Sequence, residues 1–241
     1  MFKVREESLQ HLEIAEYLIK NIRSGTFGVN EKIPSENELC RQFQVNRHTV
    51  RQAIARMTNL GWVTPLQGKG CYVNSLTRPI QYVLSSKTRF SENMENNGLK
   101  HKSKLLDWKK ERPTEEERVN LELSEDEMVY RLEILRYVDE KPISITTTVM
   151  PDKEVPFLEA YLNEFKSLYS ILLEHYQFRP IRFRSTFQAS LPMLRDSELL
   201  EIPESIPIVQ IESVMNHPSG SPIEYSVARI RGDMHKCLVE F

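Results

Sequence analysis

The first 74 residues alternate helical hydrophobic patterns with short polar breaks. Apolar residues at a spacing of three and four predict an amphipathic helix over residues 10–24. A second helix starts after Ser35, because Ser35 and Glu38 have the spacing of a capping box. Asn46 caps a third helix that continues through Leu60. A short helix, a tight turn and a longer helix predict a helix-turn-helix.

Two β-type segments follow the third helix. Residues 62–65 and 70–73 are expected to form strands, and the glycines between them allow a tight hairpin. The tip of this hairpin holds Gln67, Gly68 and Lys69. Lys69 gives the tip one positive charge, so the hairpin has the character of a wing. The pattern therefore predicts a winged helix-turn-helix domain over residues 1–74.

The rest of the chain has a different pattern. Residues 75–88 show no amphipathic helix and are predicted to form a linker. Strands are expected over 129–138, 143–149, 182–189, 208–216 and 223–231, and short helices over 167–176 and 196–200. Antiparallel strands with helices packed on one side predict an α+β domain over residues 89–241.

Composition narrows the class of protein. A chain of 241 residues with 40% hydrophobic positions can build two domains with buried cores. No apolar run reaches the length of about 18 residues that a membrane helix needs. The three cysteines, Cys40, Cys71 and Cys237, lack metal-ligand spacing, and their odd number fits a reducing cytoplasm. We expect a cytoplasmic protein without metal or cofactor.

Charge is distributed unevenly between the two halves. Residues 1–74 hold ten Lys and Arg against seven Asp and Glu, whereas residues 75–241 hold 22 against 27. Arg47 and Arg51 lie in the first turns of the third helix, where the helix N-terminus also favours phosphate. This distribution indicates nucleic-acid binding by the first domain. The alternative is an ordinary helical bundle with a solvated basic face. That alternative does not explain the capping box or the hairpin.

Three strings carry a resemblance to a known family. They are Pro34-Ser35-Glu36 with Leu39, Val45-Asn46-Arg47-His48-Thr49-Val50-Arg51-Gln52-Ala53, and Gly68-Lys69-Gly70. On these residues the segment 10–74 resembles the winged helix of the GntR family of transcription regulators. The family usually has Ser or Thr where this chain has Asn46, an equally good helix cap. The resemblance implies DNA contacts at Asn37, Asn46, Arg47, Thr49, Arg51, Gln67 and Gly68. Lys69 is expected to add a phosphate contact.

The second half resembles the effector domain (UTRA) of the HutC branch of this family, which shares its fold with chorismate lyase. Within that branch it is most similar to repressors of phosphonate-utilisation operons. The strings that carry this likeness include Arg89-Phe90-Ser91-Glu92-Asn93 and Glu224-Tyr225-Ser226-Val227. The resemblance implies an effector pocket lined by Phe90, Ser91, Arg136, Ser167 and Glu224.

The strand pattern supports an anion as the ligand. A period of two puts Arg136 on the same face as Leu132 and Ile134, and a cation on an apolar face needs an anionic partner. That partner is either a ligand phosphonate or phosphate, or the carboxylate of Glu224. Sugar-phosphate sensors of the branch often have a second Arg at the position of Ile134 and a carboxylate at that of Thr146. These differences argue against a phosphosugar.

The sequence thus predicts a ligand-responsive transcription regulator, and a repressor is the first interpretation. We expect it to bind a palindromic operator as a homodimer through its second domain, and to take a small anionic effector. A phosphosugar or carboxylate sensor of the same family is the first alternative. An enzyme of chorismate-lyase type is the second, although the sequence shows no Ser-His-Asp or Cys-His constellation. A DNA-binding architectural protein without an effector is the third.

Overall fold

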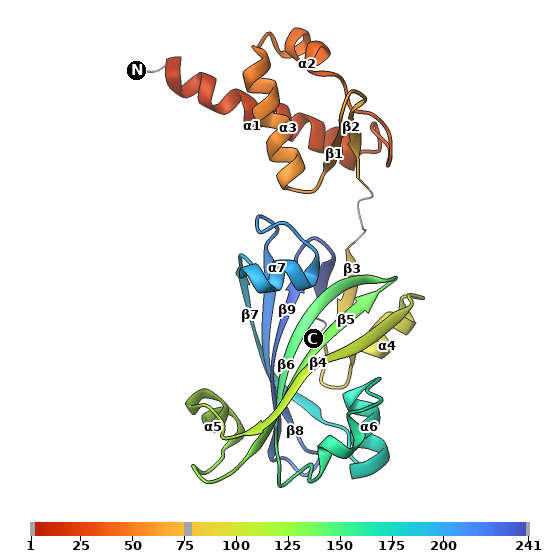
Figure 1. Ribbon diagram of the computed structural model, residues 1–241, viewed down its shortest axis with the longest axis vertical. Coiled ribbons are helices and arrows are strands. Elements are labelled where there is room, and N and C mark those ends of the chain that lie inside the picture. The colour runs from red at the N-terminus through yellow and green to blue at the C-terminus, as the bar shows by residue number, and fades with distance from the viewer. Residues whose placement is uncertain (1–2, 75–78, 240–241) are drawn as a thin grey trace. The chain divides into compact units, whose positions relative to one another are not determined.

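The computed structural model describes residues 3–74 and 79–239, and the chain divides into two compact units, Met1–Arg78 and Pro79–Phe241 (Figure 1). The first unit contains α1 (Lys3–Arg23), α2 (Glu36–Phe43), α3 (Arg47–Asn59), β1 (Val63–Leu66) and β2 (Gly70–Val73). Leu18, Leu39, Val50 and Met57 are fully buried at the centre of its core. This arrangement confirms the predicted winged helix-turn-helix.

Local hydrogen bonds fix the ends of the two helices of the motif. Ser35 and Glu38 form the predicted capping box at the start of α2. The Asn46 side chain accepts a hydrogen bond of 2.9 Å from the Thr49 backbone N–H at the start of α3. Each such cap stabilises a helix by about 1 kcal/mol. The sharp turn between α2 and α3 therefore follows from these caps together with the left-handed backbone at Gln44, where φ is +54°.

The wing is a two-stranded antiparallel hairpin of β1 and β2. Gly70 has a φ of +110°, and a Cβ atom there would lie 2.4 Å from Cε of Lys32. A side chain at Gly70 would be strained, because L-residues other than glycine rarely adopt this backbone angle. Lys32 also forms an isolated bridge to Tyr72 of β2, so the loop before α2 supports the wing.

The second unit is built on one antiparallel sheet of six strands in the order β4-β5-β6-β9-β8-β7. Its elements are β3 (Ile80–Val83), α4 (Phe90–Asn96), β4 (His101–Glu111), α5 (Glu115–Leu121), β5 (Val129–Val138), β6 (Lys141–Pro151), a 3₁₀ helix (Leu158–Tyr161), α6 (Leu168–Tyr176), β7 (Ile181–Ser190), α7 (Leu194–Leu200), β8 (Ile208–Asn216), β9 (Pro222–Arg231) and β10 (His235–Leu238). The predicted α+β class is confirmed.

Helices cover both faces of this sheet, so the expectation of helices on one side was wrong. Tyr130 and Leu132 of β5 pack with Leu172 of α6 in one core cluster. Val129, which points to the opposite face of the strand, packs with Leu121 of α5 in another. Figure 1 shows α5 and α6 on opposite sides of the same end of the sheet. Hydrophobic residues occupy both odd and even positions of β5, and both faces of this strand are buried.

The predicted linker, residues 75–88, is also corrected in part. Residues 75–78 lie outside the described part of the chain, but Ile80–Val83 is strand β3, which pairs in parallel with β10 near the C-terminus. Ile80 is buried against Met94 and Met234. β3 therefore belongs to the second unit, and the segment that follows it leads directly into α4. No helix in the described ranges is long and apolar enough to cross a membrane.

Candidate functional site

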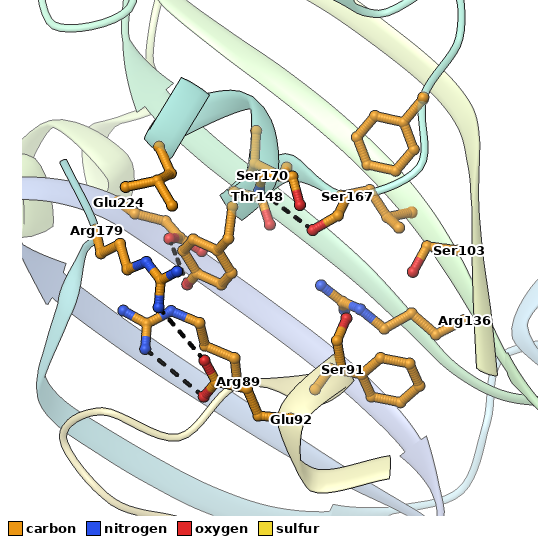
Figure 2. Close-up of a pocket in the computed structure, with 16 residues that line it drawn as sticks. Arg89, Ser91, Glu92, Ser103, Arg136, Thr148, Ser167, Ser170, Arg179 and Glu224 are labelled. Carbon is orange, nitrogen blue, oxygen red and sulfur yellow. Dashed lines mark hydrogen bonds and ion pairs between the residues drawn. The ribbon is translucent and has the colours of Figure 1, made fainter. Parts of the chain in front are cut away.

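A cavity of about 140 Å³ opens on the face of the sheet that α6 covers. An apolar cavity of about 150 Å³ holds a benzene ring, so this space fits a small ligand. All five residues expected in the effector pocket line it, namely Phe90, Ser91, Arg136, Ser167 and Glu224. They come from the start of α4, from β5, from the start of α6 and from β9 (Figure 2). The fold thus brings together residues that are up to 134 positions apart in the sequence.

Arg136 presents a guanidinium group to the cavity. Its Nη1 donates to the Thr146 hydroxyl of the neighbouring strand β6, and its Cζ lies 5.4 Å from the centre of the Phe90 ring. Burial lowers the pKa of Arg136. Within the described residues no carboxylate forms an ion pair with Arg136, so the alternative pairing with Glu224 is not formed. The guanidinium therefore keeps donors that an anion in the cavity can use.

Glu224 lies deeper and is only 3% exposed. The Tyr169 hydroxyl donates to its Oε2 at 2.8 Å. Burial raises the pKa of Glu224, and this is opposed by the Tyr169 hydrogen bond and by the charges of Arg182, Arg136 and Arg89. The pKa of Tyr169 is raised by its own burial, so the phenol stays a neutral donor. The second carboxylate oxygen of Glu224 is left to accept a hydrogen bond from a ligand.

Ser167 has the position that was predicted for it at the start of α6. Its side chain accepts a hydrogen bond of 3.4 Å from the Ser170 backbone N–H. The first N–H groups of a helix carry a partial positive charge and attract anions. The N-terminus of α6 therefore faces the same space as the Arg136 guanidinium.

Two further arginines line the cavity that sequence reasoning did not assign to the site. Arg89 precedes α4, donates from Nη2 to the Pro180 carbonyl at 2.8 Å and stacks 5.2 Å from the centre of the Tyr169 ring. Arg179 lies 3.6 Å from Glu92. Figure 2 shows Arg89, Arg179 and Glu92 across the cavity from Arg136. Arg89 adjoins the Phe90-Ser91 string and could have been included, whereas nothing local to Arg179 marks it.

A second chamber of about 90 Å³ adjoins the first and shares Arg136 and Glu224 with it. Five serine and threonine side chains contribute to its wall, from Thr88, Ser144, Thr146, Ser213 and Ser226. Arg182 of β7 reaches into it and donates from Nη1 to Ser213 at 2.6 Å. Tyr82 of β3 lines it as well. The cavity is therefore bounded in part by the segment that leads from the linker into the second unit.

The residues expected to contact DNA lie in the first unit, and most are exposed. The Arg47 Nη2 donates to Oδ1 of Asn37 at 2.8 Å, and the Arg51 guanidinium lies 3.1 Å from Glu36. These contacts hold both arginines at the start of α3. At the tip of the wing Gln67, Gly68 and Lys69 are all exposed.

Thr49 differs from the other members of this set. It is 6% exposed, and its hydroxyl donates to the Asn46 side chain at 3.2 Å. The Thr49 side chain thus supports the helix cap and is turned away from the surface. The end of the Lys32 side chain lies against Gly70 of the wing. Lys32 is an exposed cation that the sequence patterns did not single out.

Comparison with known proteins agrees with this architecture. Residues 10–73 match the model of the bacterial regulatory proteins, gntR family, and residues 96–236 match the UTRA domain. One relative, from Escherichia coli (strain K12) and named "Probable transcriptional regulator PhnF", is 32% identical over 96% of this chain and 95% of its own length. The HTH-type transcriptional repressor NagR of Bacillus subtilis (strain 168) is 27% identical over 93% of this chain and 91% of its own.

A solved structure shares the fold. The crystal structure of PhnF from Mycobacterium smegmatis has a TM-score of 0.64 at 23% identity and covers 95% of this chain and 98% of that one. The UTRA match extends over more than half of the present sequence. The chain therefore belongs to the GntR family of bacterial regulatory proteins, as a transcription regulator whose winged helix-turn-helix is followed by a UTRA domain.

Proposed function

We propose that this protein is a repressor whose affinity for operator DNA changes when a small organic anion binds in the cavity of its second unit. The observation that carries the proposal is Arg136, which is charged, faces the cavity and has no carboxylate partner among the described residues. Burying an unpaired charge is costly, so an anionic ligand would offset that cost. The N-terminus of α6 adds N–H donors on the same side.

The chemistry of the cavity favours a phosphonate or a small organophosphate. Arg136 and the helix N-terminus suit a tetrahedral anion, while Glu224 can accept from an ammonium or a hydroxyl group. A zwitterion such as an aminoalkylphosphonate would satisfy both. A phosphosugar is the runner-up, and Ile134 and Thr146 argue against it because neither supplies a charge for a hydroxyl-rich ring.

Calorimetry with defined probes tests the ligand class. The probes are 2-aminoethylphosphonate, methylphosphonate, a hexose 6-phosphate and a dicarboxylate, each titrated into the wild-type protein and Arg136→Ala. We expect the phosphonates to bind and Arg136→Ala to lose roughly 10–100-fold in affinity, because hydrogen bonds to charged groups contribute about 1.5–3 kcal/mol.

Arg118→Ala is the matched control, since Arg118 lies on α5 and pairs with Glu115 away from the cavity. It should bind like wild type. In Glu224→Gln, the preference for the aminoalkyl over the methyl compound should shrink. Tight binding of an uncharged ligand, or anion binding that is indifferent to Arg136, would overturn the proposed ligand class.

We propose further that the protein binds its ligand without converting it. No His or Cys is among the cavity-lining residues of the described chain, so the cavity offers no imidazole or thiolate for acid–base or nucleophilic steps. The relatives named above are transcription regulators or repressors. Turnover of a bound phosphonate, followed by phosphorus NMR, would support the enzyme of chorismate-lyase type instead.

We propose that the first unit binds operator DNA, and that the protein acts in the cytoplasm, where bacterial DNA lies. Arg47 and Arg51 would read bases or grip phosphates, and Asn37, Asn46, Gln67, Gly68 and Lys69 would add contacts, with Thr49 acting through the cap. A homodimer would match the two-fold symmetry of a palindromic site.

The test uses a DNA site selected by the wild-type protein from random sequence. Arg47→Ala and Arg51→Ala should each weaken binding by about 1–3 kcal/mol if the side chain reads a base. Arg56→Ala, in the last turn of α3, is the control. A folded Arg47→Ala, Arg51→Ala double variant that keeps full affinity would contradict the assignment.

A further inference from the structure

The charged side chains that line the cavity and its second chamber do not balance. Within the described parts of the chain they are four arginines and two glutamates, namely Arg89, Arg136, Arg179, Arg182, Glu92 and Glu224. Glu92 is shared between two of the arginines, since it lies 3.6 Å from Arg179 and 4.0 Å from Arg89. Charges removed from water need partners of opposite sign. A ligand that neutralises the whole space therefore carries two negative charges in excess.

Arg182 of β7 is the arginine of this group that the proposed anion site does not use. It lines the second chamber, and its Nη1 donates to the hydroxyls of Ser185 at 2.9 Å and Ser213 at 2.6 Å. Its Nε is buried without a hydrogen-bond partner, and no carboxylate among the residues that the structure describes forms an ion pair with it. A guanidinium with neutral partners alone keeps donors that a second anionic group can use.

A β-bulge turns Arg182 toward the chamber. β7 pairs with β8 with a register shift between Arg182 and Arg184, so that Phe183 is the extra residue. Met215, opposite Arg182, lines the chamber, whereas Val214, opposite Arg184, packs in the core cluster on the α5 face of the sheet. Residues two apart in a regular strand share a face, and bulges beside functional sites redirect side chains. The bulge thus gives the chamber a cation that a regular strand would point to the other face.

The size and chemistry of the second chamber favour a carboxylate. Its volume is about 90 Å³. One water needs roughly 10–15 Å³ of such space, so a group of three heavy atoms fits. A planar carboxylate also matches the fork of a guanidinium, and the hydroxyl of Ser213 adds a polar neighbour.

We propose that the second chamber is a carboxylate subsite built around Arg182, so that the effector is an amino acid with a phosphonate at the end of a short side chain. The phosphonate would lie against Arg136 and the start of α6, the ammonium group at Glu224 and the carboxylate at Arg182. With a fully ionised phosphonate, such a ligand has the two excess negative charges that the chambers require. The inference rests on the proposed function and narrows its ligand class.

Calorimetry with a matched pair of compounds tests the subsite. The probes are 2-aminoethylphosphonate and 2-amino-3-phosphonopropionate, which differ in one carboxylate, and the two enantiomers of the second compound are titrated separately. We expect one enantiomer to bind the wild-type protein roughly 10–100-fold more tightly than 2-aminoethylphosphonate, because hydrogen bonds between charged groups are strong. In Arg182→Gln this preference should disappear, while the affinity for 2-aminoethylphosphonate should change little. Arg182→Lys keeps the charge and should retain part of the preference.

Arg184→Gln is the matched control, because Arg184 lies two positions further along β7 and donates to Asn120 of α5 on the other face of the sheet. It should keep the full preference. Thermal unfolding checks the fold of each variant, and a general loss of stability does not remove the preference for one compound of the pair selectively. Equal binding of the two compounds by the wild-type protein, or an unchanged preference in Arg182→Gln, would overturn the carboxylate subsite and leave the anion site at Arg136 intact. If neither compound binds, the proposed ligand class fails as well.

Discussion

At the scale of single residues, His235 should make the second unit sensitive to acid. It lies on β10 with its ring 5.6 Å from that of Tyr82, and its Nε2 is buried without a partner. Burial lowers the pKa of His235 from 6.5 to about 4. The unfolded chain therefore takes up a proton at a pH where the folded chain does not. The free energy of unfolding should fall as the pH drops from about 6.5 to about 4 and level off below that.

Chemical denaturation at pH 7 and pH 5 measures this effect. His235→Gln should remove about 2 kcal/mol of the difference in unfolding free energy between the two pH values. His175→Gln is the control, because His175 is exposed. If both variants keep the wild-type dependence on pH, the buried neutral state of His235 is not the cause of acid sensitivity.

Arg136 and Thr49 show what a residue's sequence context does and does not determine. The period of a strand puts Arg136 on the cavity face, and the structure agrees. Its partners, Thr146 and Phe90, depend on strand pairing and on the placement of α4, and no local pattern contains that information. Thr49 lies in a family motif, yet the 3.2 Å hydrogen bond to Asn46 makes it part of a cap. A motif locates residues, but burial decides which of them can touch a partner.

At the scale of elements, the wing should contribute a contact that does not depend on DNA sequence. Lys69 is exposed at the tip between β1 and β2, and Gly68 with a φ of +72° holds the turn. Lys69→Ala should weaken binding to all sequences alike and reduce the slope of log affinity against log salt by about one phosphate contact. Lys141→Ala in the second unit should leave the slope unchanged. An unchanged slope for Lys69→Ala would mean that the wing tip does not touch DNA.

Elements with strong local signals were predicted well, and those that depend on distant partners were not. The helices α2 and α3 have capping residues next to an apolar face, so their starts were predicted correctly. The helix α5 has a capping box of Thr114 and Glu117 as well, but its seven residues are too few for a clear period. The strand β3 has four residues, and its partner β10 lies more than 150 positions away. Such a short strand forms only because the rest of the unit already holds its partner.

At the scale of the whole molecule, the division into a DNA-binding and an effector-binding part was predicted from the change in pattern near residue 75, and the two family matches fall on either side of it. The exact boundary was not predicted, because β3 looks like linker until its pairing is known. This matters for function, since Tyr82 of β3 lines the second chamber while the same segment leads back toward the first unit. If the proposed anion binds there, we expect it to bias the segment that connects the two units.

The boundary predicts how two fragments should behave. Residues 79–241 keep β3, which pairs with β10 and buries Ile80 against Met94 and Met234. Residues 89–241 lose this strand, leave the edge of β10 unpaired and expose Met234. Loss of one buried aliphatic side chain costs about 1.5–3 kcal/mol before the backbone pairing is counted.

Residues 79–241 should unfold cooperatively and bind the anion with the affinity of the full-length protein. Residues 89–241 should be less stable by at least that amount and should bind the anion more weakly. Urea unfolding and calorimetry compare the pair, which differs only in ten residues. Equal stability and equal affinity would show that β3 is a linker after all.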